Sequence, residues 1–324
     1  MMKTVRFPKY TYGIEVECVG RSATHLMVIN ALNAAGLRAV SENTFTGNYD
    51  SQSWIVGYDG SVEGTNAMEI KSPILQGTEG FRAIRTFSKT MLELDVTRPP
   101  TVNKSCGLHV HIGIANAEKK FIADEILMIM ERYTELKPEI DKLLAKSRRS
   151  DEDNDYCMDF DSSVRNVGDY IADLDVRTRR RALDNNTLSS LADCADHYDA
   201  VSIQALDKYG TIEFRQHQGT LSGEKITNWI RFLLTHVDVS RFLVKQALDA
   251  RDAAAVERAT AALSGVRRAS APGMRPARRT PRARSTVAVP VPFGKPAKHE
   301  LFDGQPKRVK DFFIKRREEL ASEA

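Results

Sequence analysis

The sequence has no apolar run that approaches the roughly 20 residues a helix needs to cross a bilayer, so no membrane partner is expected. The first residues, MMKTVRFPKYTYG, are basic and lack the apolar core of a secretory signal. The cysteines include no C-x-x-C pair and no dense framework, since they are spread over Cys18, Cys106, Cys157 and Cys194. Together these absences predict reduced thiols and a cytoplasmic location.

Acidic residues are missing from the segment 266–299, which holds nine lysines and arginines and six of the twelve prolines. Removing nine positive charges from the net charge of +4 leaves −5 on the rest of the chain. The basicity therefore belongs to one segment, and the remaining chain is not typical of a nucleic-acid-binding protein. We expect a domain over 1–265, a flexible Arg/Pro-rich linker over 266–299 and a short terminal helix over 300–324.

The linker has two interpretations that the sequence leaves open. It can be a solvated tether for the terminal helix, or an arm that binds nucleic acid or an acidic partner. No other part of the chain suggests such a partner, and the oligomeric state is open.

Alternation of apolar and polar residues predicts strands near 11–19, 53–58, 67–71, 107–114 and 198–216. Helical spacing of apolar residues occurs over 22–36, 77–95, 117–144 and from Ser222 to about residue 264. Pro138 is expected to kink or divide the third of these helices. The mixed order predicts an α+β fold with an antiparallel or mixed sheet.

The stretch TYGIEVECVG, residues 11–20, places two glutamates on one face of a strand. Glu15 and Glu17 lie opposite Tyr12, Ile14 and Val16 if the stretch is extended. A solvated sheet face is one explanation. The other is a cation between the two carboxylates, which would offset their repulsion.

Three more strands show the same pattern, each with charged or imidazole side chains two residues apart. The pairs are Glu69 and Lys71 in AMEIKSP, His109 and His111 in CGLHVHIGI, and Glu213, Arg215 and His217 in TIEFRQHQGT. Carboxylates suit hard divalent cations, and a neutral imidazole can complete such a site. Lysine and arginine suit phosphate oxygens. The four strands together favour a shared site for divalent cations and a polyphosphate.

In this order the segments YGIEVE, DGSVEG…MEIKSPIL, CGLHVHIG and YGTIEFRQHQGTL…NWIRFLL resemble those of the putative amidoligases, over roughly residues 10–245. That family belongs to the carboxylate–amine ligases related to glutamine synthetase and glutamate–cysteine ligase. The resemblance implies a glutamine-synthetase-like curved antiparallel sheet flanked by helices. It also implies an ATP-dependent amide or peptide ligase that acts through an acyl phosphate. The substrates would be a small-molecule or peptide carboxylate and an amine.

By the same resemblance, the implied cofactors are ATP and Mg²⁺ or Mn²⁺. The implied metal ligands are Glu15, Glu17, Glu69, His109 and Glu213, and the implied ATP-binding residues are His111, Arg215 and Lys71. Arg215 and Glu213 are the implied catalytic residues. Ser202 departs from the family, where asparagine is common. The arginine run 177–181 is either a solvated helix face or the source of a substrate-binding arginine.

Two other classes of function remain open. The H-x-H motif with clustered glutamates could belong to a metal-dependent hydrolase of amides, or Cys106 with His109 could form a thiol enzyme. A hydrolase gives no reason for Lys71 and Arg215 on the same face. The third class is a non-catalytic binding protein that retains the fold, and a failure to bind ATP with Mg²⁺ would favour it.

Overall fold

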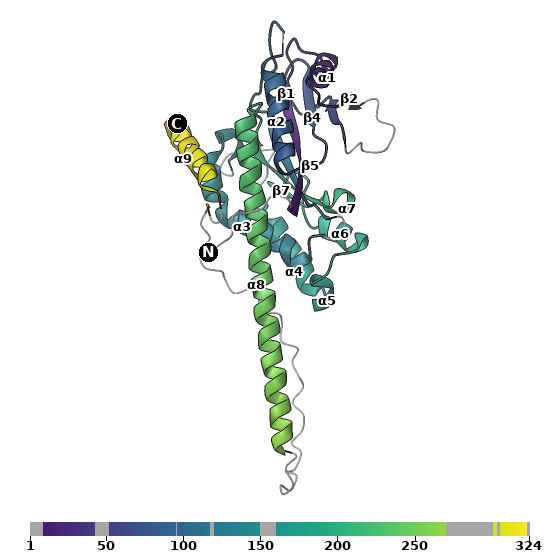
Figure 1. The fold of residues 1–324 in the computed structure, drawn as a ribbon, viewed down its shortest axis with the longest axis vertical. Helices are drawn as coiled ribbons and strands as arrows, with labels where there is room; N and C mark the ends of the chain where they lie inside the picture. Colours follow the sequence, from purple (N-terminus) through teal and green to yellow (C-terminus); the bar gives the residue numbers. More distant parts are fainter. Residues whose placement is uncertain are drawn as a thin grey trace.

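The computed structural model describes residues 9–42, 52–94, 96–116, 120–149, 160–269, 301–302 and 305–322. Within these ranges eight strands form one open sheet flanked by helices, so the expected α+β fold is confirmed (Figure 1). The strand order is β2-β3-β4-β1-β6-β8-β7, with β5 paired to β1, and the described pairs are antiparallel except β2–β3. The strands are β1 (Tyr10–Val19), β2 (Ala39–Ser41), β3 (Trp54–Gly57), β4 (Ala67–Lys71), β5 (Leu75–Gln76), β6 (Gly107–Ile114), β7 (Val201–Ser202) and β8 (Thr211–Gln218).

The centre of the sheet is β1, which pairs with β4 on one side and β6 on the other. Its apolar residues are fully buried on one face, namely Tyr10, Tyr12, Ile14, Val16 and Cys18. Leu108, Val110 and Ile112 of β6 are equally buried. Alternation therefore leaves the other face of these strands to the polar residues.

Helices α2 (Gly77–Leu92) and α3 (Ala123–Ile140) both pack against α8 (Gly223–Ala269), and the three helices contribute to the core on the apolar side of the sheet. Aromatic pairs join the layers. Tyr12 of β1 stacks on Phe81 of α2 at 5.1 Å, and Tyr133 of α3 meets Phe214 of β8 at 5.6 Å between ring centroids. Such contacts bury large apolar areas and fix which face of the sheet is covered.

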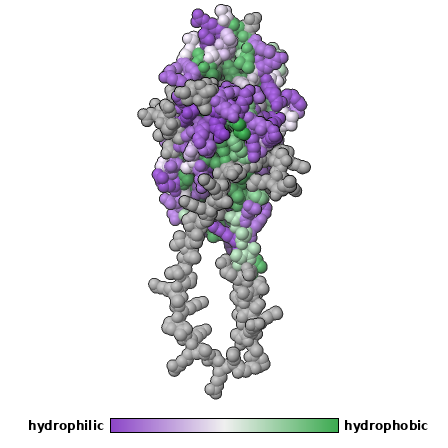
Figure 2. Space-filling model, turned by 90° about the vertical axis from the view of Figure 1, so that its left-hand side faces the viewer, coloured by the Kyte–Doolittle hydropathy of each residue, from purple (hydrophilic) through white to green (hydrophobic). Residues whose placement is uncertain are grey.

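The smaller helices surround this core. They are α1 (His25–Ala34), α4 (Asp161–Asp173), α5 (Val176–Arg179), α6 (Asn185–Ala192) and α7 (Leu206–Tyr209), with 3₁₀ turns at Asp141–Leu143 and Lys146–Arg148. In the described chain no helix is both long and apolar enough to cross a membrane. Figure 2 shows a face of the body that is mostly hydrophilic, with hydrophobic residues visible between the polar ones.

Helix α8 is continuous from Gly223 to Ala269, whereas the sequence predicts breaks and an end near 264. Its first half is buried, and its second half extends away from the body (Figure 1). Helix α9 (Lys307–Ser322) packs on this first half, with Phe313 at 5.6 Å from Phe232 between ring centroids. Of the expected linker 266–299, the first four residues belong to α8 and the rest lies outside the described residues.

The expected strand over 198–216 is wrong, because β7 and β8 are separated there by α7. Gly210 ends α7 with φ of 66°, a left-handed conformation that suits glycine. Pro138 neither divides nor ends α3 at once, since the helix continues to Ile140 and passes into a 3₁₀ turn.

Candidate metal centre

Strand register brings the predicted metal-binding residues together across four strands, β4, β1, β6 and β8. Glu15 lies directly between Lys71 of β4 and His109 of β6. Glu17 is paired with Glu69, and His111 is paired with Glu213 of β8. Because directly opposed residues project from the same face of a sheet, these side chains share the face that the helices leave open.

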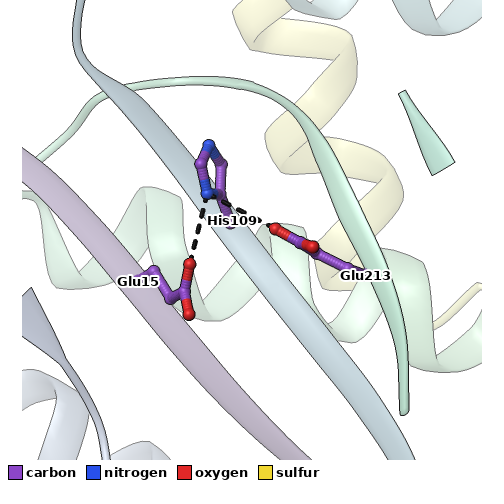
Figure 3. Close-up of side chains that lie close together, drawn as sticks. All are labelled: Glu15, His109 and Glu213. Carbon is purple, nitrogen blue, oxygen red and sulfur yellow. Dashed lines mark hydrogen bonds and ion pairs between the residues drawn. The ribbon is translucent and has the colours of Figure 1, made fainter. Parts of the chain in front are cut away.

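His109 lies at the centre of this cluster, with only 4% of the residue exposed. Its Nδ1 is 3.4 Å from Glu15 Oε2 and 3.5 Å from Glu213 Oε1 (Figure 3). Its Nε2 is 3.4 Å from Glu17 Oε1. The other carboxylate oxygen of Glu17 accepts a hydrogen bond of 2.6 Å from the backbone N–H of Gly107, which fixes that side chain.

The two ring nitrogens of His109 thus serve two groups of potential ligands. One group is Glu15, His109 and Glu213, and the other is Glu17, Glu69 and His109, and in each the donor atoms lie within 4.8 Å of one another. Carboxylate and imidazole donors suit divalent cations. In a neutral imidazole one ring nitrogen has the lone pair and the other carries a hydrogen. If one nitrogen of His109 binds a metal, the N–H of the other can therefore donate a hydrogen bond to a carboxylate of the opposite group.

The carboxylates of Glu15 and Glu69 have pKa values that move in opposite directions. Burial and the charge of Glu15 raise the pKa of Glu69 to about 8, against the opposing effect of Lys71. Burial also opposes ionisation of Glu15, but His109 and His111 outweigh it and hold the pKa of Glu15 well below its usual range. The cluster therefore resists ionisation of all its carboxylates near neutral pH, and a bound divalent cation would offset that repulsion.

His111 lies beside this group and offers a nitrogen to a ligand. Its Nδ1 is 3.2 Å from Thr211 Oγ1. Its buried Nε2 lies 3.5 Å from Glu15 Oε1, but no described atom meets it with hydrogen-bond geometry. Burial lowers the pKa of His111, but the carboxylates of Glu15 and Glu213 outweigh this and raise it.

The two predicted phosphate-binding cations lie at opposite sides of the cluster. Lys71 Nζ is 2.9 Å from Glu69 Oε2 and 3.5 Å from Glu42 Oε1. Arg215 Nη1 is 2.6 Å from Glu213 Oε1, and the arginine is only 8% exposed. Arg215 therefore contacts a predicted metal ligand directly, so a phosphate would have to replace or share this ion pair.

His217 is not on this face, contrary to the sequence prediction that it joins Glu213 and Arg215. Between Leu108 and Val110 of β6 the register shifts, because Leu108 opposes His217 while Val110 opposes Phe214. This bulge adds one residue to β8 and reverses the alternation beyond it. His217 consequently packs against Trp229 of α8, with ring centroids 5.1 Å apart.

A cavity of about 530 Å³ opens beside the cluster and is bordered by Glu15, Lys71 and His111. Sequence reasoning missed several of its lining residues, namely Glu42, Lys208, Tyr209 and Thr211. Thr211 could have been found, because it precedes Glu213 by two residues on the same strand. Glu42 follows the short strand β2, and Lys208 and Tyr209 lie in the four-residue helix α7, so no periodic pattern marks these residues.

The structure argues against two of the alternatives that the sequence leaves open, a Cys106 nucleophile and a solvated or substrate-binding role for the arginine run. Cys106 is fully buried, and burial raises the pKa of its thiol, which opposes a thiolate nucleophile. In the arginine run, Arg179 donates to Asp124 of α3 and Arg180 donates to Asp252 of α8. These two arginines tie helices together.

Ser202 is buried on β7 in the register position opposite Glu213.

A family model described as "putative amidoligase enzyme" matches residues 8–237. The match includes the described strands and the glutamate–histidine cluster, and it ends within α8, before α9 begins. No curated protein matches the chain.

Proposed function

Because the chain belongs to the family of putative amidoligase enzymes, we propose that it joins a carboxylate to an amine in an ATP-dependent reaction. ATP phosphorylates the carboxylate, and the amine displaces phosphate from the acyl phosphate to leave an amide. The substrates are an amino acid, a peptide or an amine. The same proposal takes the antiparallel sheet as the counterpart of the curved sheet in glutamine synthetase.

The observation that carries the proposal is the arrangement of charge on one sheet face. Glu15, Glu17 and Glu213 lie 3.4–3.5 Å from the ring nitrogens of His109. Glu69 belongs to the same donor group as Glu17 and His109. Lys71 and Arg215 flank the cluster through ion pairs with Glu69 and Glu213. A hydrolytic metal site needs the carboxylates and imidazole but has no use for two cations beside them. A nucleotide phosphate chain uses the metal-binding carboxylates and imidazole, and it also uses the two cations, which pair with its oxygens.

The residues that would hold Mg²⁺ or Mn²⁺ are Glu15, Glu17, Glu69, His109 and Glu213. The fit rests on the crowded carboxylates, which raise the pKa of Glu69, and on the two donor groups around the His109 ring. Metal bound there would neutralise phosphate charge as the phosphoryl group is transferred.

The remaining polar residues have positioning roles in this proposal. Arg215 would hold the transferred phosphoryl group, and its ion pair with Glu213 fixes the guanidinium at the edge of the metal site. Lys71 and His111 would bind nucleotide phosphates. Both border the 530 Å³ cavity, where Ile55, Ile74 and Tyr209 offer apolar surface to the remainder of a bound substrate.

The test is incubation of the full chain with ATP, Mg²⁺ and pooled amino acids and polyamines. Phosphate release and new amide masses are recorded together, with EDTA as the metal-free control. ADP and phosphate formed in step with an amide would support the ligase. ATP-independent cleavage of amides would instead identify a hydrolase, and absence of ATP binding would identify a binding protein.

A further inference from the structure

We propose that the protein has a second ligand site, for a small phosphate- or carboxylate-bearing molecule, on the helical side of the fold. The site is a cavity of about 650 Å³ between α2, the first turns of α8 and α9. In Figure 1, α2 and α9 lie on either side of the upper part of α8. Its lining residues differ entirely from those of the cavity beside the metal cluster.

Arg231 of α8 is the buried cation of this cavity. Only 4% of it is exposed, and its guanidinium lies 4.3 Å from the centroid of the Phe81 ring. Nη1 donates to Asn228 Oδ1 at 3.3 Å, while the buried Nε has no hydrogen-bond partner among the described residues. No described carboxylate forms an ion pair with it either. A buried charge without a counter-ion is unfavourable, so an anion in the cavity would offset that cost.

Further cations line the same cavity from two other helices. Arg85 and Lys89 belong to α2, and Arg308 belongs to α9. Burial, together with the like charges of Arg308 and Arg85, lowers the pKa of Arg231 to about 10, which still leaves it protonated near neutral pH.

The lining carboxylates do not balance these cations. They are Glu93, whose Oε2 is 3.9 Å from Lys89 Nζ, and Glu224. Four cations thus face two carboxylates. The start of α8 adds its own positive end, at which the N–H of Gly223 donates to Ser88 Oγ at 2.7 Å.

The chemistry of the lining indicates the kind of ligand. Planar guanidinium groups match phosphate and carboxylate oxygens. Leu92 and Phe312 add apolar surface at the rim. A volume of about 650 Å³ is that of a small-molecule site.

Arg308 and Phe312 come from α9, which lies outside the family match over 8–237. A ligand held by Arg85, Arg231 and Arg308 would therefore bridge α9 to the body, and of these three residues Arg308 lies outside the family match. This inference does not depend on the proposed ligase chemistry.

The experiment is isothermal calorimetry on the full chain, in EDTA and chloride at constant ionic strength. Inorganic phosphate and pyrophosphate are one arm and citrate is the other, so that the two sources of oxyanion are separated. The variant pair is Arg85→Gln with Arg308→Gln, because both residues are exposed and their replacement should leave the fold intact. The control is Arg82→Gln, an exposed arginine of α2 outside the cavity.

We expect saturable binding of at least one of these anions, weakened roughly tenfold or more in the double variant and unchanged in Arg82→Gln. Arg231→Lys, which keeps the charge but loses the fork, should weaken binding while the circular dichroism spectrum stays native. Anion binding should also slow amide exchange in α9. No saturable binding, or equal binding by the wild type and the double variant, would overturn the proposal.

Discussion

At the scale of single residues, the glutamates of β1 are distinguished by their neighbours. Glu15 lies between Lys71 and His109, whereas Glu17 faces another carboxylate, Glu69. From β6, Glu17 receives a hydrogen bond from the N–H of Gly107 and lies 3.4 Å from the ring of His109. The Glu17–Glu69 pair is therefore the part of the cluster that gains most from a bound cation.

Replacing Glu17 by Gln tests this point. Millimolar Mg²⁺ or Mn²⁺ with nucleotide should raise the melting temperature of the wild type, because a ligand that binds only the folded state stabilises it. In Glu17→Gln that rise should shrink, while Glu79→Gln, at an exposed glutamate of α2, should keep it in full. Equal rises of the melting temperature in all three proteins would mean that Glu17 does not bind the cation.

Arg215→Ala tests the proposed phosphoryl contact. Phosphate release should fall by roughly a hundredfold or more, as expected for loss of a preorganised charge at a reacting centre, while the fold and much of the nucleotide affinity remain. Lys at this position should restore only part of the rate, since it lacks the bidentate fork. If Arg215→Ala turned over nearly as fast as the wild type, Arg215 would have only a structural role, through its ion pair with Glu213.

His217 predicts a pH dependence of stability. Burial against Trp229 lowers its pKa to about 3, well below the value near 6.5 of an unfolded histidine. Below pH 6.5 only the unfolded state takes up the proton, so the contribution is complete above that pH and is lost as the pH falls toward 3. Between pH 6.5 and 5.0 the loss amounts to about 2 kcal/mol.

Denaturant unfolding at several pH values should therefore show a steeper acid loss of unfolding free energy in the wild type than in His217→Gln. His197→Gln, at an exposed histidine, is the matched control. Identical slopes in the wild type and His217→Gln would contradict the assignment of His217 to the apolar interior.

At the scale of elements, alternation predicted where β1, β4 and β6 lie and which of their residues share a face. Cross-strand register was beyond reach, because it depends on which strands pair, and only pairing places Glu15 beside His109. The bulge in β8 was also beyond reach, because local sequence does not mark an inserted residue. Helices α4 and α6 were missed, and α6 spans only eight residues, which carry little periodic signal.

Gly219, just after β8, tests the close approach of β8 to the start of β6. An added Cβ would lie 2.5 Å from Cys106 Cβ and 2.9 Å from its backbone oxygen, and backbone cannot yield as a side chain tip can. Gly219→Ala should lower the unfolding free energy by about 1–3 kcal/mol. In α4, Gly168→Ala meets only Leu127 Cδ1 at 3.8 Å. It should be neutral or stabilising by up to about 1 kcal/mol, and equal effects would refute the close approach.

At the scale of the whole molecule, the contributions of the basic linker and of α9 have to be tested separately. A truncation after residue 265 removes both, and α9 buries Val309, Phe313 and Leu320 against the body. Replacing residues 270–300 by a Gly/Ser sequence of equal length separates the two. Phosphate release and melting temperature should stay unchanged, since neither the cluster nor α9 is altered. Lost turnover in a folded replacement would assign the linker a role in the reaction.

The aromatic contact beneath α9 gives the molecule an optical reporter. The chain has two tryptophans, and Trp229 lies 6.1 Å from Phe313 of α9, while Trp54 stacks on Phe87 of α2. With Trp54 replaced by Phe, the remaining emission comes from an indole that α9 shields from water. Detachment of α9 would admit water to that ring and shift its fluorescence to longer wavelength. Docking and release of the terminal helix could then be followed in real time, without a label.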